Sequence, residues 1–205
     1  MTACVSSSLC PLPCPLIVFP MARKNSWADS TDTAIHVVGI MWLVFLAEIL
    51  LPFDLRAQGI RPRSMTGLWG ILFCPFLHAN LTHLAANSVA LFVLLVLSLS
   101  FSRRLTTVAS AFILLIGGGL VWCLGRVNTV HIGASGWIFG LIGFLITAGA
   151  VRKEWRALVF SLLVLVLYGG TLHALLHSEP GISWISHAGG FVAGVLSAWW
   201  TRKKT

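Results

Sequence analysis

Charge is scarce in this sequence. Only six of its 205 residues are acidic, and charged residues of both signs make up 10% of the chain, whereas hydrophobic residues make up 57%. A soluble domain carries about 25% charged residues, so this chain could not cover a water-soluble surface. The shortage excludes a secreted disulfide module and a soluble enzyme built on a nucleotide-binding sheet. A polytopic membrane protein is the class that fits.

Several sequence features that are absent exclude or disfavour further classes of protein. The net charge is +8, but no basic run is longer than Arg202–Lys204, so a nucleic-acid partner is not expected. Cys10 and Cys14 lack a second Cys/His pair at zinc spacing, and no HExxH motif occurs, so we expect no metal and no cofactor. No internal repeat is present, which weighs against an inverted-repeat transporter. No Lys or Arg precedes the first apolar stretch, which disfavours a signal peptide.

What the sequence does contain is a series of apolar segments, each close to the roughly 20 residues that a membrane span needs. We therefore predict an all-α fold: a polytopic bundle of six transmembrane helices. The predicted spans are Ala34–Leu51, Leu81–Phe101, Leu105–Leu124, Ile132–Val151, Ala157–Leu176 and Ile182–Thr201.

Basic residues between the spans predict the topology. The side that holds both chain ends would carry ten Lys and Arg residues, such as Arg103, Arg152 and Arg202, against four on the other side. The positive-inside rule then places both termini in the cytoplasm, most simply at the plasma (inner) membrane. We predict a disordered cytoplasmic tail at residues 1–33, a membrane domain at 34–201 and a basic cytoplasmic tail at 202–205. Whether translation starts at Met1 or Met21 stays open.

The connection Pro52–Leu77 is too long for a simple turn, and connections of this length are usually functional or disordered. It mixes arginines with an apolar half that is too short to span a bilayer. We predict an amphipathic element embedded in the outer interface.

Three polar clusters interrupt the apolar segments, where polar groups are costly and usually face a partner or a cavity. Each has a plain structural explanation when taken alone. The glycines could serve helix packing, His187 could be a hydrogen-bonded structural residue, and the pair His83 and Asn87 on one helix face could tie two helices together. The clusters are His78-Ala-Asn-Leu-Thr-His83-Leu-Ala-Ala-Asn87, Gly133-Ala134-Ser135-Gly136 and His187-Ala-Gly189-Gly190-Phe-Val-Ala-Gly194.

Depth in the membrane links the clusters. Counting along each helix from the cytoplasmic basic residues puts Ser135 roughly 25 Å and His187 roughly 22 Å above them. Asn87 lies about 24 Å and His83 about 30 Å above the same level. A nucleophile, a base and two donors are thus expected at nearly one height, in the outer part of the membrane.

This combination suits acyl-transfer chemistry. Serine needs an adjacent base to become a nucleophile, and neutral imidazole suits that role. The amide of Asn87, the ring of His83 and the backbone N–H of Ser135 are candidates for stabilising an oxyanion. No acidic residue lies within the three clusters, so a Ser–His dyad is a simpler hypothesis than a triad.

The three motifs together resemble those of the rhomboid intramembrane serine proteases, over roughly Ala34 to Thr201. The family's HxxxxHxxxN motif corresponds to His78, His83 and Asn87, and its GxSG motif to Gly133, Ser135 and Gly136. The sixth-helix pattern corresponds to His187, Gly190 and Gly194. The resemblance implies Ser135 as nucleophile, His187 as base, a short fourth helix opening into a water-filled outward cavity, and an embedded first loop.

Two positions depart from the family pattern. Trp69 is followed by Gly70 rather than by arginine, so Arg61 or Arg63 would have to take over the structural role of that loop arginine. Phe139 stands where an aromatic residue, often tyrosine, is found; it can still stack on His187. Neither change removes a group that the mechanism requires.

The resulting prediction is a serine endopeptidase that cuts single-span transmembrane proteins, with membrane lipid as its other partner. The alternatives are a catalytically inactive rhomboid-like binding protein and a transporter or channel. The sequence does not specify an oligomeric state.

Overall fold

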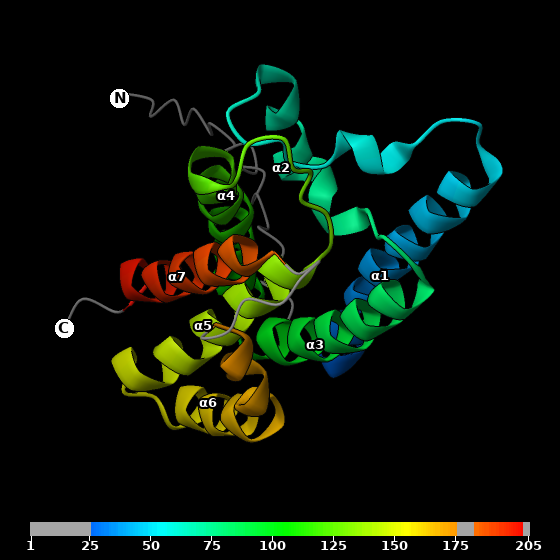
Figure 1. The fold of residues 1–205 in the computed structure, drawn as a ribbon. Coiled ribbons are helices and arrows are strands. Elements are labelled where there is room, and N and C mark those ends of the chain that lie inside the picture. Colours follow the sequence, from blue (N-terminus) through cyan, green and yellow to red (C-terminus); the bar gives the residue numbers. More distant parts are fainter. Residues whose placement is uncertain (1–25, 176–182, 203–205) are drawn as a thin grey trace, which may run out of the picture.

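The computed structural model describes residues 26–175 and 183–202, which form a bundle of helices (Figure 1). Within these ranges there is no β-strand, only an isolated antiparallel bridge between Ile60 and His131. The all-α fold class is therefore confirmed. The main helices are α1 (Trp27–Leu50), α3 (Leu81–Phe112), α4 (Gly118–Leu124), α5 (Ser135–Val151), α6 (Trp155–Tyr168) and α7 (Trp184–Trp200).

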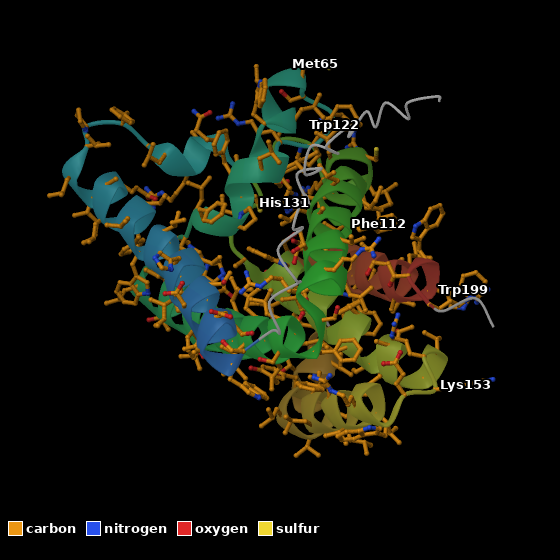
Figure 2. All side chains as sticks on the ribbon, turned by 180° about the vertical axis from the view of Figure 1, so that it is seen from behind. Met65, Phe112, Trp122, His131, Lys153 and Trp199 are labelled. Atoms are coloured by element: carbon orange, nitrogen blue, oxygen red, sulfur yellow. The ribbon has the colours of Figure 1, made fainter. Side chains whose placement is uncertain are left out.

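Short helical turns fill the connections. The segment after α1, which the sequence predicted to be an embedded amphipathic element, folds as four of them and lies along one end of the bundle (Figure 2). They are η1 (Leu55–Gln58), η2 (Met65–Leu68), α2 (Gly70–Phe73) and η3 (Cys74–Phe76), with a π-helical segment η4 (Ile113–Gly117) before α4 and a 3-10 segment η5 (Gly170–Leu175) after α6.

The helix α3 contains the second predicted span and the start of the third, joined across a kink. Ser102 has φ −165° and ψ 111°, which breaks the helical path between the two halves. The hydroxyls of Ser98 and Thr106 are hydrogen-bonded across the kink at 2.6 Å, and Arg156 donates to the carbonyl of Ser100 at 3.3 Å. The second half then continues through η4 and α4 as far as Leu124.

The first helix begins earlier than predicted. It starts at Trp27, so residues 27–33 are helical, which corrects the prediction of a disordered tail for that part. Ser26 caps the helix by accepting a hydrogen bond from the backbone of Asp29, and the Thr31 hydroxyl donates to the Trp27 carbonyl. Residues 1–25 and 203–205, which hold most of both predicted tails, lie outside the described residues.

Three other predicted boundaries also shift. The fifth segment was expected at Ala157–Leu176, but α6 ends at Tyr168, where two glycines follow and lower the helix propensity. The fourth helix begins at Ser135 rather than Ile132, because Gly133 is held at φ +109°. The sixth begins at Trp184 rather than Ile182, after a cap at Ser183.

Helix α5 lies at the centre of the bundle, and its residues from Ile138 to Leu145 are all buried. Its closest neighbour is α7. A Cβ atom added to Gly190 would collide with the Gly136 carbonyl oxygen, and one added to Gly194 would collide with that of Gly140. The glycines therefore bring the two backbones into direct contact, as small residues do between membrane helices.

Apolar side chains cover much of the outside of the bundle. Leu158, Val166 and Leu167 on α6 are exposed, as are Leu43 and Leu50 on α1. Among the described residues, two helical stretches are long and apolar enough to cross a membrane, Trp27–Leu50 and the kinked Leu81–Leu124. An exposed apolar surface of this extent marks contact with lipid or with another protein.

Candidate active site

Ser135 is the first residue of α5, and the backbone before it is hydrogen-bonded at two points to the segment between α1 and α3. His131 and Ile60 exchange backbone hydrogen bonds at 2.9 and 3.0 Å, and the Gly133 N–H donates to the Cys74 carbonyl at 2.9 Å. The Cys74 thiol in turn donates to the Gly133 carbonyl at 3.6 Å, and burial raises the pKa of this thiol to about 12. The segment between α1 and α3, which contains Ile60 and Cys74, therefore fixes the backbone that leads to Ser135.

Gly133 is a position that only glycine fits. Its φ of +109° is one that residues with a Cβ rarely adopt. An added Cβ would also lie 2.7 Å from Cε1 of His83 and 3.4 Å from Nδ2 of Asn87. The glycine thus lets the backbone before Ser135 approach both predicted donors on α3.

His187 lies on α7, one turn after the capping residue Ser183, and is 7% exposed. Its ring is stacked on Phe139 of α5, with centroids 4.2 Å apart and an angle of 18° between the planes. Its Nδ1 atom has no hydrogen-bond partner among the described residues, and none of the described carboxylates contacts it. Glu179 lies outside the described residues.

His83 and Asn87 lie on the first turns of α3, and His78 precedes that helix. His78 is fully buried; its Nε2 accepts a hydrogen bond from Nδ2 of Asn87 at 3.1 Å, and its Nδ1 lies 3.3 Å from the Phe76 carbonyl. The rings of His78 and His83 meet edge to face at 5.1 Å. Asn80 caps the helix by accepting from the His83 backbone at 2.8 Å.

One cavity of about 690 Å³ is lined by Ser135, His187, His83 and Asn87 together. The four predicted site residues come from three helices, α3, α5 and α7, and line the same cavity. No hydrogen bond joins Ser135 to His187 within the described residues, and catalytic hydrogen bonds of this kind commonly tighten only when substrate binds. Also within those residues, no three His, Cys, Asp or Glu side chains form a metal site.

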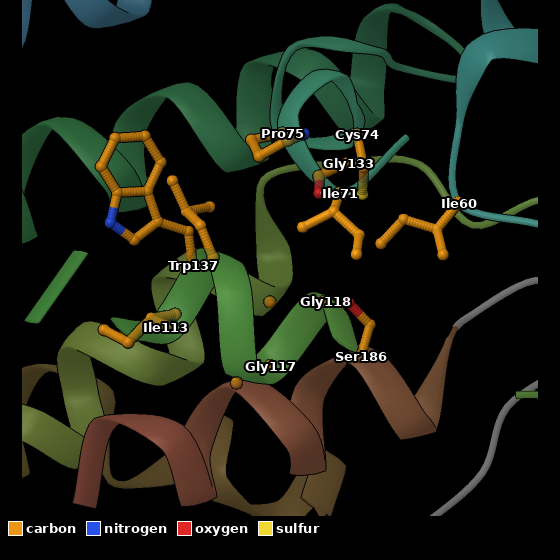
Figure 3. A pocket seen from close by; sticks show the side chains of 13 residues that line it. Ile60, Ile71, Cys74, Pro75, Ile113, Gly117, Gly118, Gly133, Trp137 and Ser186 are labelled. Atoms are coloured by element: carbon orange, nitrogen blue, oxygen red, sulfur yellow. Dashed lines mark hydrogen bonds between the residues drawn. The ribbon is translucent and has the colours of Figure 1, made fainter. Parts of the chain in front are cut away.

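A second cavity, of about 30 Å³, is lined in part by Gly133 and Gly136, which lie on either side of Ser135 in the sequence (Figure 3). It is lined by Cys74, Gly133, Gly136 and Ser186, together with apolar side chains such as Ile113. Its size suits one water molecule. Residues of the segment around Ser135 therefore line two cavities of very different size.

One of the two loop arginines considered above is anchored to the bundle. Arg63 donates from Nη1 to the Cys123 carbonyl at 2.7 Å, at the end of α4, so it is Arg63 rather than Arg61 that ties the loop to the bundle. Gly70 stands where the family often has arginine, and a Cβ there would collide with the backbone of Gly59. The loop closes on itself at this point and leaves no room for a larger residue.

Three residues that build the candidate site were not predicted from the sequence: Asn80, Cys74 and His131. Asn80 as a helix cap was readable, because asparagine is among the preferred residues at that position. Cys74 and His131 were not, since their partners Gly133 and Ser183 are distant in sequence and no local pattern marks them.

Together these features define a class: an α-helical bundle with an apolar exterior, in which a serine and a histidine from adjacent helices face one cavity. A model of the Rhomboid domain matches residues 65–204. The chain therefore belongs to the rhomboid family, whose members are membrane-embedded, as the sequence resemblance indicated.

Relatives are similar over most of the chain. An uncharacterized protein of Mycobacterium tuberculosis is 40% identical over 187 residues, covering 86% of this chain and 77% of the relative. An uncharacterized protein of Mycobacterium leprae is 36% identical over 188 residues, covering 86% and 73%. The Bacillus subtilis protein YdcA, provisionally named a rhomboid protease, is 28% identical over 166 residues, covering 77% and 80%.

Proposed function

We propose that this chain is an intramembrane serine endopeptidase that hydrolyses peptide bonds in the outer part of transmembrane segments. The observation that carries the proposal is the single cavity lined by Ser135, His187, His83 and Asn87. Both members of a Ser–His pair are present and face the same space. This argues against the alternative of an inactive rhomboid-like binding protein.

The proposed reaction begins at Ser135. Its hydroxyl attacks the scissile carbonyl while the neutral imidazole of His187 takes the proton, and the imidazolium later protonates the leaving amine. With no carboxylate against His187 among the described residues, the pair acts as a dyad. The Phe139 ring holds the imidazole by stacking, and its π face stabilises the imidazolium that forms.

The oxyanion of the tetrahedral intermediate is assigned to donors around Gly133. The Asn87 amide gives one N–H to His78, which leaves its second N–H for the oxyanion and fixes its direction. The ring of His83 and the backbone N–H of Ser135, at the start of α5, complete the set. His78 acts through Asn87 and positions it.

The membrane arrangement that we propose has six spans, with α3 supplying one and, after its kink, part of a second. Arginines at one end of the bundle support it. Arg103 donates to the Asp29 carbonyl at 3.0 Å and Arg152 to the Thr201 carbonyl at 2.7 Å, so the turns that carry them lie at that end. We assign this end, and both termini, to the cytoplasm of a cell with the protein in its plasma membrane.

The distance along α5 then sets the depth of the cut. Ser135–Val151 spans 17 residues, or roughly 25 Å at 1.5 Å per residue, so Ser135 lies near the outer face of a core about 30 Å thick. Substrates are single-span membrane proteins whose helix unwinds locally there, and small or helix-breaking residues favour this.

Reconstitution in proteoliposomes with a single-span substrate tests the proposal. Ser135→Ala and His187→Ala should each abolish cleavage, and the double variant should be little worse than either, because members of a catalytic unit are not additive. Mass spectrometry of the product ends should place the cut in the outer part of the span. Binding of the substrate without cleavage would favour the inactive alternative, and a cut at the cytoplasmic side would overturn the topology.

A further inference from the structure

His131 is hydrogen-bonded through both of its ring nitrogens. Nδ1 lies 2.6 Å from the Ser183 hydroxyl, and Nε2 lies 3.0 Å from the Thr129 hydroxyl. Its backbone forms the bridge to Ile60 in the loop that follows α1. His131 lies in the segment before Ser135 and joins that segment to the loop after α1 and to the start of α7.

The direction of these bonds can be worked out from the neighbouring donors. The Thr129 hydroxyl donates its one proton to the Arg126 carbonyl at 2.5 Å, so it accepts from Nε2–H of His131. Nδ1 then accepts from the Ser183 hydroxyl, whose oxygen accepts from the Ser186 N–H at 3.3 Å. Burial lowers the pKa of His131. The lowered pKa favours the neutral ring with one N–H, which is the form that these hydrogen bonds require.

The two residues at the ends of this hydrogen-bonded link, His131 and Ser183, lie next to the proposed reacting groups. Ser183 caps α7, and its carbonyl accepts the N–H of His187 at 3.2 Å. His131 shortly precedes Gly133 and Ser135 in the same segment. His131 and Ser183 both line the large cavity. The link therefore joins the helix that carries the base to the segment that carries the nucleophile.

We propose that His131 is a positioning residue, which holds the first turn of α7 in register with Ser135 through its bond to Ser183. The proposal rests on the proposed function for its effect on catalysis, although the coupling itself is a property of the fold. His131 is not assigned a proton-transfer step, since both of its nitrogens are occupied by hydroxyl partners.

Two conservative variants separate this role from a general packing role. The amide of asparagine can take the place of Nδ1 and keep the Ser183 bond, whereas the amide of glutamine can take the place of Nε2 and keep only the Thr129 bond. His131→Asn should therefore retain most activity and His131→Gln should not. His131→Phe should lower kcat by about 10- to 100-fold with KM nearly unchanged, because a misplaced base costs rate rather than binding.

A second readout does not depend on activity. Hydrogen–deuterium exchange of the peptide that covers residues 183–190 should be faster in His131→Phe, in His131→Gln and in Ser183→Ala than in the wild type and His131→Asn. His36→Phe, the same change at an exposed histidine on α1, is the matched control and should leave both readouts unchanged. The kcat losses of His131→Phe and Ser183→Ala should not add in the double variant.

Equal behaviour of His131→Asn and His131→Gln in exchange and in kcat would overturn the proposal, as would additive losses. If His131→Phe does not fold, Ser183→Ala and the asparagine–glutamine pair decide the question. If the wild type cleaves no substrate, the proposed function fails. The exchange comparison still supports or overturns the coupling in that case.

Discussion

The ring of His187 lies flat against the ring of Phe139, with centroids 4.2 Å apart. The two residues come from the adjacent helices α7 and α5, whose backbones touch at Gly190 and Gly136. Backbone contact and ring stacking together fix where the imidazole stands relative to the start of α5. The proposed base is therefore oriented by packing rather than by a carboxylate among the described residues.

Removing the stacked ring should slow the reaction. Phe139→Leu keeps an apolar side chain but loses the π face, so we expect kcat to fall about tenfold, equivalent to roughly 1.4 kcal/mol of transition-state stabilisation. Phe139→Tyr keeps the face and should stay within about threefold of the wild type. Steady-state cleavage kinetics on both variants make the comparison, and equal rates for leucine and phenylalanine would argue against stacking.

Helix contact at Gly190 should control stability. Gly190→Ala drives a methyl group into the Gly136 carbonyl, and neither backbone can move away cheaply. We expect the free energy of unfolding in detergent to fall by about 1–3 kcal/mol, with loss of cleavage. Gly39→Ala is the control: no atom lies within 4 Å of its added Cβ, and alanine favours a helix by about 1 kcal/mol. A Tm equal in both variants would contradict this packing.

Gly133→Ala should abolish most activity at a modest cost in stability. The backbone at φ +109° would be strained by about 1–3 kcal/mol, and the methyl group would press on the His83 ring. Gly119→Ala has open space around its Cβ and serves as the control. Cleavage rates and thermal unfolding should be measured together. Retention of full activity in Gly133→Ala would mean that its neighbours on α3 play no part in the reaction.

Asn87 should act on rate more than on binding. Asn87→Ala removes the amide that His78 orients, and we expect kcat to fall by about 10²-fold, as for other single oxyanion donors, while KM changes little. His78→Phe removes only the orienting partner and should give a smaller loss of the same kind. An increase in KM with unchanged kcat would assign Asn87 to substrate binding instead.

Much of the site could be predicted from the sequence because its parts are local motifs on helices. Ser135, His187, His83 and Asn87 were each marked by their motifs, and the constant helical rise predicted nearly one height for them. The packing glycines were readable for the same reason, since Gly190 and Gly194 are spaced one helical turn apart on one face.

What could not be predicted depends on contacts between distant segments. The bond from Arg63 to the Cys123 carbonyl and the link from His131 to Ser183 join loops whose relative position only the folded bundle fixes. The start of α1 was misplaced for a different reason. Asp29 and Asp32 lower the hydropathy near its N-terminus, although the cap at Ser26 makes this stretch a stable first turn.

The most direct test of the account is labelling by a fluorophosphonate probe, which reacts covalently with an activated serine. The purified wild-type protein in detergent should gain the mass of one probe on the peptide that contains Ser135. Ser135→Ala should gain none, and His187→Ala should be labelled far more slowly. A wild type that stays unlabelled, or that is labelled at another serine, would contradict the assignment of Ser135 and His187 as a catalytic dyad.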